Sequence, residues 1–175
     1  MKPSLSTRRG RLMVRCLVIV SIVAVSAAIF ALPAAATDPV KYPFAFTFSD
    51  ELRDVCPFPI NVDATVSGFG IDYFDKNGAL IRTFNHNIEQ DTFTANGKTL
   101  VGLPYNFNME FFFDSNGQLT KWVVSGIFST IPLPDGSLFI SAGRADFLAH
   151  GGHALLSPDK GNPGNIAGFC AALAP

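Results

Sequence analysis

Charged residues are scarce in this sequence, and their charges nearly cancel. Asp, Glu, Lys and Arg make up 15% of the 175 residues, and the formal net charge is −1. Five of the 13 Lys and Arg lie before residue 37, so the rest of the chain has eight against 14 Asp and Glu, a net charge of −6. Those eight are scattered rather than clustered, which argues against a nucleic-acid or anionic-lipid partner.

Recognisable catalytic motifs are also missing. The sequence has no Gly-x-Ser-x-Gly, no P-loop, no calcium-binding loop pattern and no neighbouring Cys and His pair. Beyond residue 36, no stretch of 12 residues has clear helical periodicity. These absences favour an all-β domain that is not an enzyme, and they predict no cofactor.

The one long apolar run, residues 16–32, lies close to the N-terminus. It follows a basic segment that contains Lys2 and four Arg, and it precedes Pro33-Ala34-Ala35-Ala36. This order is typical of a secretory signal peptide, here residues 1–36, with an uncleaved anchor as the alternative. We therefore expect a secreted or cell-envelope protein with no membrane contact after cleavage. Residues 37–55 are expected to be a leader and edge segment, and residues 56–175 an antiparallel β-domain.

Cysteine is rare as well, with three in the chain. Cys16 falls in the predicted signal peptide, so Cys56 and Cys170 remain. An even pair in an exported chain predicts a disulfide, which here would close a loop of 114 residues. A loop of this length gives about 5 kcal/mol of stabilisation as an upper estimate. The bond would hold residues 166–173, expected as a helical turn or an extended tail.

Turn dipeptides divide the middle of the chain at regular intervals. Asn-Gly or Asp-Gly pairs begin at residues 77, 96, 116 and 135, with spacings of 19, 20 and 19 residues. Weak points near the middle of each interval are Asn85-His86-Asn87, Gly102-Leu103-Pro104 and Ser125-Gly126, the last being either a turn or a bulge. The pattern predicts an antiparallel meander of about eight strands, each of roughly eight residues. We expect a small barrel, with a tight β-sandwich as the alternative.

The segment 105–131 predicts a long hairpin with an aromatic inner face. Alternation places Phe107, Met109, Phe111 and Phe113 on one side of a strand. Trp122 or Val124 is expected to face them across the turn. Phe112 must then point to the opposite face. Either the sheet is covered on both faces, or Phe112 is an exposed apolar spot to which another molecule could adhere.

Four short motifs carry a resemblance to a family. They are Cys56-Pro57-Phe58-Pro59, Leu133-Pro134-Asp135-Gly136, Gly143-Arg144 and Cys170-Ala171-Ala172-Leu173. Together they resemble exported bacterial all-β proteins of an uncharacterised family. The resemblance implies the fold and the disulfide, and it implies no catalytic residue.

Four residues are candidate ligand-binding positions: Glu110, Phe112, Trp122 and Arg144. A buried charge needs a partner, so Arg144 is expected to pair with Glu110 or Asp146, as a structural clamp or a ligand anchor. We expect a non-catalytic exported domain that binds a small apolar or aromatic ligand or a partner surface in the envelope. The alternative is a small-barrel enzyme with Arg144, Glu110 and His86 in its lumen.

His150-Gly151-Gly152-His153 is the one local pattern that suggests a metal. Zinc needs three or four ligands, and the sequence indicates no third ligand beside this pair, although His86 or Asp146 could complete a site. We therefore predict that the protein binds no metal.

Overall fold

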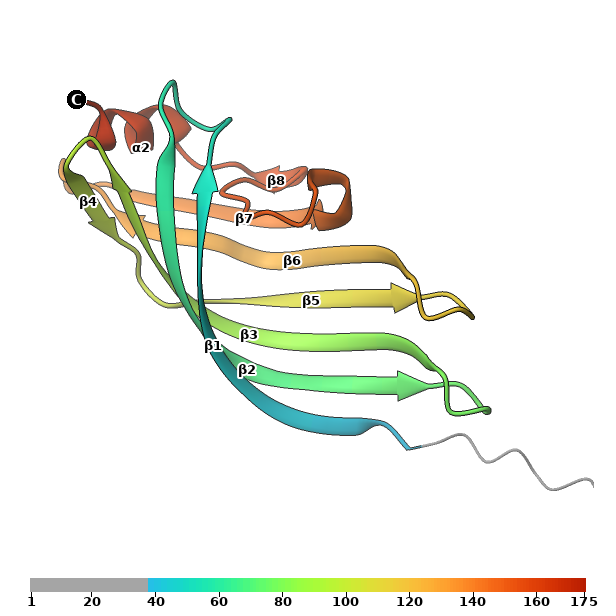
Figure 1. Cartoon of the computed structure of the whole chain (residues 1–175). Helices are drawn as coiled ribbons and strands as arrows, with labels where there is room; N and C mark the ends of the chain where they lie inside the picture. The colour runs from blue at the N-terminus through green and yellow to red at the C-terminus, as the bar shows by residue number, and fades with distance from the viewer. Residues whose placement is uncertain (1–37) are drawn as a thin grey trace, which may run out of the picture. The chain divides into compact units, whose positions relative to one another are not determined.

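The computed structural model describes residues 38–175, so the predicted signal peptide and its cleavage site lie outside the described residues. The described part is one antiparallel sheet of eight strands with the order β1-β2-β3-β5-β6-β7-β8, in which β4 pairs with the end of β3 (Figure 1). This confirms the all-β antiparallel prediction. The elements are β1 (Val40–Leu52), β2 (Ile60–Phe74), β3 (Leu80–Ala95), β4 (Lys98–Val101), β5 (Tyr105–Phe113), β6 (Leu119–Pro132), β7 (Leu138–Asp146), the 3-10 helix η1 (Phe147–His150), β8 (Lys160–Asn162) and α2 (Ile166–Leu173).

All four predicted turn dipeptides connect neighbouring strands. The glycine of each has a positive φ, between 73° and 85°, which a residue with a Cβ rarely adopts. In the turn between β5 and β6, the Asp114 carboxylate accepts the N–H groups of Asn116 and Gln118 at 2.8 and 2.9 Å. These local bonds explain why the turns could be read from the sequence.

The three midpoint breaks have three different outcomes. The break at residues 102–104 is confirmed, because it separates β4 from β5. Gly126 lies inside a continuous β6 with a φ of 130°, just before a shift in strand register, so the bulge alternative is correct there. The break predicted at residues 85–87 is wrong, because β3 runs through it without interruption. β2 and β5 pair with this segment on both sides, which outweighs its turn-forming composition.

The expected closure into a barrel is wrong, and the sheet is closer to a sandwich. Within residues 38–175, β1 pairs only with β2 and the short β8 only with β7, so both edges stay open. Figure 1 shows the reason for the sandwich-like form: β1, β2 and β3 bend strongly along their length. After β4, the N–H of Leu103 donates to the carbonyl of Thr130 on β6 at 2.7 Å. After β7 the chain forms η1, the short β8 and α2, and within the described residues none of them pairs with β1.

The segment before Cys56 contributes more to the sheet than the expected leader. β1 spans 13 residues and pairs along its whole length with β2. Pro43 lies within this edge strand, where a missing N–H costs least. The β-sheet therefore begins at Val40 and not at Cys56.

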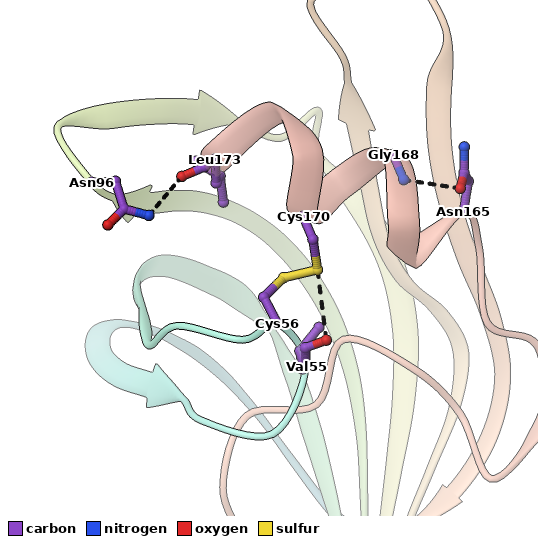
Figure 2. The surroundings of a disulfide bond; sticks show 7 residues. All are labelled: Val55, Cys56, Asn96, Asn165, Gly168, Cys170 and Leu173. Carbon is purple, nitrogen blue, oxygen red and sulfur yellow. Dashed lines mark hydrogen bonds between the residues drawn. A yellow bond between two sulfur atoms is a disulfide. The ribbon is translucent and has the colours of Figure 1, made fainter. Parts of the chain in front are cut away.

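α2 is fastened to the sheet by the predicted disulfide, which is confirmed. Cys56 and Cys170 are joined with their Cα atoms 5.6 Å apart (Figure 2). Asn165 caps the helix by accepting the N–H of Gly168 at 3.0 Å, and Asn96 donates to the Leu173 carbonyl at 2.9 Å. Of the two expected forms, the C-terminal segment is helical.

Two apolar clusters form the core of residues 38–175. The first lies around α2, where the fully buried ring of Phe169 contacts Phe93 and Phe139 at centroid distances of 5.3 and 5.4 Å. The second contains Tyr105, Phe107, Val124, Phe128, Ala145 and Phe147. Members of both clusters line the pocket described next.

Candidate functional site

The inner side of the predicted hairpin lines a pocket on the concave face of the sheet. Phe107, Met109 and Phe111 of β5 face it, as expected. Trp122 is the register partner of Phe111, and their rings are 5.1 Å apart. Phe113 lies beyond a register shift at the end of β5, and it is not part of the lining within the described chain.

The edge strand and the C-terminal loop complete the pocket. Phe44, Phe46 and Phe48 of β1 line it, and Phe46 is half exposed at the rim. From the other side come Phe147 of η1 and, from the following loop, Gly152 and Ala154 to Leu156. Asp50 on β1 holds this loop, because its carboxylate accepts the N–H of Ala154 at 2.9 Å. The pocket has a volume of about 380 Å³, within the range of small-molecule sites.

A stripe of polar residues on β3 crosses this aromatic surface. Alternation places five polar side chains on the concave face: Thr83, Asn85, Asn87, Glu89 and Asp91. The last four line the pocket. Sequence reasoning missed them, although the alternation of polar residues was a usable signal. Because residues 85–87 were predicted to be a turn, the strand was divided there, and the alternation of its side chains between the two faces was not recognised.

Two acids of this stripe, Glu89 and Asp91, both contact the hydroxyl group of Tyr105. The Tyr105 hydroxyl lies 2.9 Å from the Glu89 carboxylate and 2.8 Å from that of Asp91. All three residues are buried, with exposed fractions of 8%, 3% and 5% for Glu89, Asp91 and Tyr105. A phenol has one hydrogen to donate. Satisfying both contacts therefore requires a second proton, held by one of the carboxyl groups.

The electrostatics place that proton on Glu89. Burial, followed by the charge of Asp91, raises the pKa of Glu89 from its ordinary value of 4.5 to about 8. Burial also raises the pKa of Asp91. The pKa of Tyr105 is raised by burial and then by both acids, so the phenol remains protonated. We call Glu89 and Asp91, with Tyr105 between them, the acid pair.

Three polar atoms of pocket residues find no hydrogen-bond partner among residues 38–175. They are the Oδ1 atoms of Asp91 and Asn85, which accept, and the Trp122 indole Nε1, which donates. A buried polar atom without a partner is costly, typically about 1–3 kcal/mol. The pocket is therefore polar enough to orient a ligand.

Of the four sequence-predicted site residues, Trp122 alone lies in the pocket. Glu110 and Phe112 alternate with Met109 and Phe111, so they occupy the opposite face of β5. Lys121 lies over the Phe112 ring at 5.7 Å. Arg144 is exposed, and its neighbour Ala145 is the buried one. The structure does not bring these three residues together with Trp122.

Glu110 and Asp146, the two expected ion-pair partners of Arg144, contact other groups instead. The nearest cation to Glu110 is Arg82, at 3.9 Å, and Arg82 also lies over the Tyr73 ring. Asp146 instead caps η1 by accepting the N–H groups of Leu148 and Ala149. Among residues 38–175, no ion pair joins Arg144 to Glu110 or Asp146, so the expected structural clamp does not form.

The three histidines lie apart in separate contacts. His150 contacts Asp159 at 2.7 Å, and His153 contacts Asp50 at 3.4 Å. His86 bonds to Asn108 at 2.9 Å, on the face opposite the pocket. Within the described chain, no three His, Cys, Asp or Glu side chains gather as metal ligands do.

No family model matches the chain, and neither the curated proteins nor the solved structures contain a match. The resemblance to exported bacterial proteins therefore stays a prediction. None of the helices between residues 38 and 175 is long and apolar enough to cross a membrane. The disulfide fits a compartment outside the reducing cytoplasm.

Proposed function

We propose that the chain is an exported, non-catalytic β-domain that binds a small, mainly apolar or aromatic ligand in its concave pocket. The observation that carries the proposal is the pocket itself: about 380 Å³ of space walled by aromatic side chains and crossed by a polar stripe. Sites for small organic molecules have this composition, with apolar walls and a few oriented polar groups. A concave site of this size favours a small ligand over a flat partner surface.

Export is supported by two features of the chain. Residues 1–36 have the order of charges, apolar residues and small residues that a signal peptide needs. The disulfide between Cys56 and Cys170 suits the oxidising conditions of the cell envelope or exterior. We therefore expect the ligand to be met outside the cytoplasm.

Titration of the disulfide-bonded protein with Nile red, a neutral apolar dye, tests the binding function. We expect one dye per chain, with energy transfer from Trp122, the single tryptophan. Phe111→Ala should weaken binding about tenfold, which corresponds to about 1.4 kcal/mol. Phe112→Ala is the matched control, because its ring points to the opposite face. Absence of saturable binding, or equal losses in both variants, would contradict the proposal.

The acid pair favours a second candidate function, general acid–base catalysis in the same pocket. Buried groups with raised pKa values next to a ligand space are frequent in active sites. Such an enzyme would exchange the acidic C–H hydrogens of a bound ketone with solvent. With phenylacetone in D₂O, NMR would show exchange that is faster for the parent protein than for Tyr105→Phe. Equal rates would leave binding alone as the function.

A further inference from the structure

The charge of the pocket has one sign. Three acids line it: Asp50, Glu89 and Asp91. No Lys, Arg or His is part of the lining in residues 38–175. Asp50 already has partners, because its carboxylate accepts the N–H groups of Ala154 and Glu51 and lies 3.4 Å from His153. The negative charge that remains for a ligand is that of the acid pair.

The acid pair also has an acceptor that a ligand can use. Asp91 is 97% buried, and within the described part of the chain no N–H or hydroxyl group donates to its Oδ1, so the neighbouring Glu89 carboxyl, which hydrogen-bonds to Asp91, is its one source of a proton. A neutral hydrocarbon would leave this acceptor unsatisfied, and an organic anion would be repelled by it. A ligand N–H donor on a cation satisfies both the acceptor and the charge.

The walls around the acid pair suit a cation with an apolar body. Tyr105 and Phe107 lie side by side on β5, with ring centroids 5.8 Å apart, and Phe111 and Trp122 continue the same surface. Aromatic faces attract cations and also bury apolar carbon. Asn85 Oδ1 offers a second acceptor for an ammonium group. An amine on a short aromatic or aliphatic skeleton combines all of these features.

We propose that the ligand of this pocket is a small organic amine, bound as its cation with the ammonium group on Glu89 and Asp91 and the apolar body against Phe107, Phe111 and Trp122. This assignment rests on the proposed binding function and specifies its ligand class. On binding, the ammonium group donates to Asp91 in place of the Glu89 proton. It also stabilises the ionised form of Glu89, so amine binding releases a proton from the acid pair.

Three probes of one skeleton test the ligand class by calorimetry on the disulfide-bonded protein. They are 2-phenylethylamine, the neutral 2-phenylethanol and the anionic 3-phenylpropanoate. We expect the amine to bind at least tenfold more tightly than the alcohol, with the carboxylate weakest. Equal or tighter binding of the alcohol or carboxylate would overturn the amine assignment.

Variants that remove a charge show which residues the ammonium group contacts. Asp91→Asn and Glu89→Gln keep the side-chain shape, and each should reduce the preference for the amine over the alcohol to less than threefold. Glu110→Gln on the opposite face of the sheet is the control, and it should leave the preference unchanged. If the amine preference survives in both pocket variants, the acid pair is not the binding position.

Measuring the affinity at a series of pH values tests the same contact, between the ammonium group and the acid pair, in the unmodified protein. The groups that face the bound cation are Glu89 and Asp91 from β3 and Tyr105 from β5, with Asp50 from β1 and His153 from the loop nearby. Between pH 7 and 8.5 an alkylamine keeps its proton while Glu89 ionises. Affinity for the amine should rise severalfold over this range, and affinity for the alcohol should not.

Nile red separates the two proposals. If the dye binds while the amine does not, the pocket takes apolar ligands and the amine assignment alone fails. If none of the probes binds, the proposed function fails as well. A constant amine affinity across the pH range would likewise exclude the acid pair as its partner.

Discussion

The pKa of Glu89 is raised because of where the residue lies, in a buried, largely apolar pocket beside another acid. Neither effect acts on the same residue in the unfolded chain, where the carboxyl group is hydrated and its pKa is ordinary. Folding therefore changes the proton affinity of this one residue more than a surface contact would. Tyr105 reduces the cost, because its hydroxyl donates its one hydrogen to one acid and accepts from the other.

At the residue scale we predict that stability depends on pH through Glu89. The pKa of Glu89 is raised on folding, from 4.5 to about 8, so the folded state holds a proton that the unfolded chain releases above pH 4.5. Its stabilising contribution is full below that pH and is lost as the pH rises toward 8. The free energy of unfolding should therefore decrease as the pH rises. In Glu89→Gln this decrease should be smaller by at least about 1.4 kcal/mol, the equivalent of one pKa unit.

Urea unfolding at pH 5 and pH 8, followed by circular dichroism, measures this effect. Glu110→Gln is the control, since Glu110 lies on the opposite face, beside Arg82, and its removal should leave the pH dependence as it is. An unchanged difference between pH 5 and pH 8 in Glu89→Gln would show that Glu89 does not hold the proton.

At the scale of single elements, α2 depends on contacts with distant parts of the chain. It has eight residues, too few for a helix to be stable alone in water. The buried Phe169 and Leu173 hold it against the sheet. The Asn165 cap and the Cys170 bond, both drawn in Figure 2, add to this. The disulfide therefore stabilises the chain end and the first core cluster together.

We predict that the double variant Cys56→Ser, Cys170→Ser lowers the free energy of unfolding by about 2–5 kcal/mol. The bond closes a long loop, and its loss lets the unfolded chain expand. Thermal unfolding of both proteins measures the change. Asn165→Ala, which removes the helix cap, should cost about 1 kcal/mol and serves for comparison. An unaltered melting temperature in the double variant would mean that packing alone holds α2.

At the scale of the whole molecule, the open sheet and the pocket belong together. A barrel of eight strands would close around its interior, whereas this sheet bends and leaves Phe46 half exposed at the pocket rim. The loop that ends in Leu156 covers part of the opening through its bond to Asp50.

For the whole chain we also predict export with cleavage after Ala36. A basic segment, an apolar run and Ala at the −3 and −1 positions are what a signal peptidase recognises. N-terminal sequencing of protein recovered from the culture medium or envelope should begin at Thr37, or within two residues of it. A chain that begins at Met1 there would indicate an uncleaved anchor.

Much of the architecture was readable from local patterns. The Asn-Gly and Asp-Gly turns, the alternation that turns Phe107 and Phe111 inward and the pairing of Cys56 with Cys170 each depend on a few residues or on compartment. These patterns act at short range, because backbone conformation and side-chain direction are set residue by residue.

The tertiary structure decided which strands stay paired and which polar groups meet. Residues 85–87 have a turn-like composition, but β2 and β5 hold them in a strand, and this brings Glu89 and Asp91 into phase with the concave face. Tyr105 reaches both acids only because of the register between β3 and β5. The open sheet likewise depends on where the last strand ends. Pairing and register are contacts between distant segments, and their energies arise only once the chain has folded.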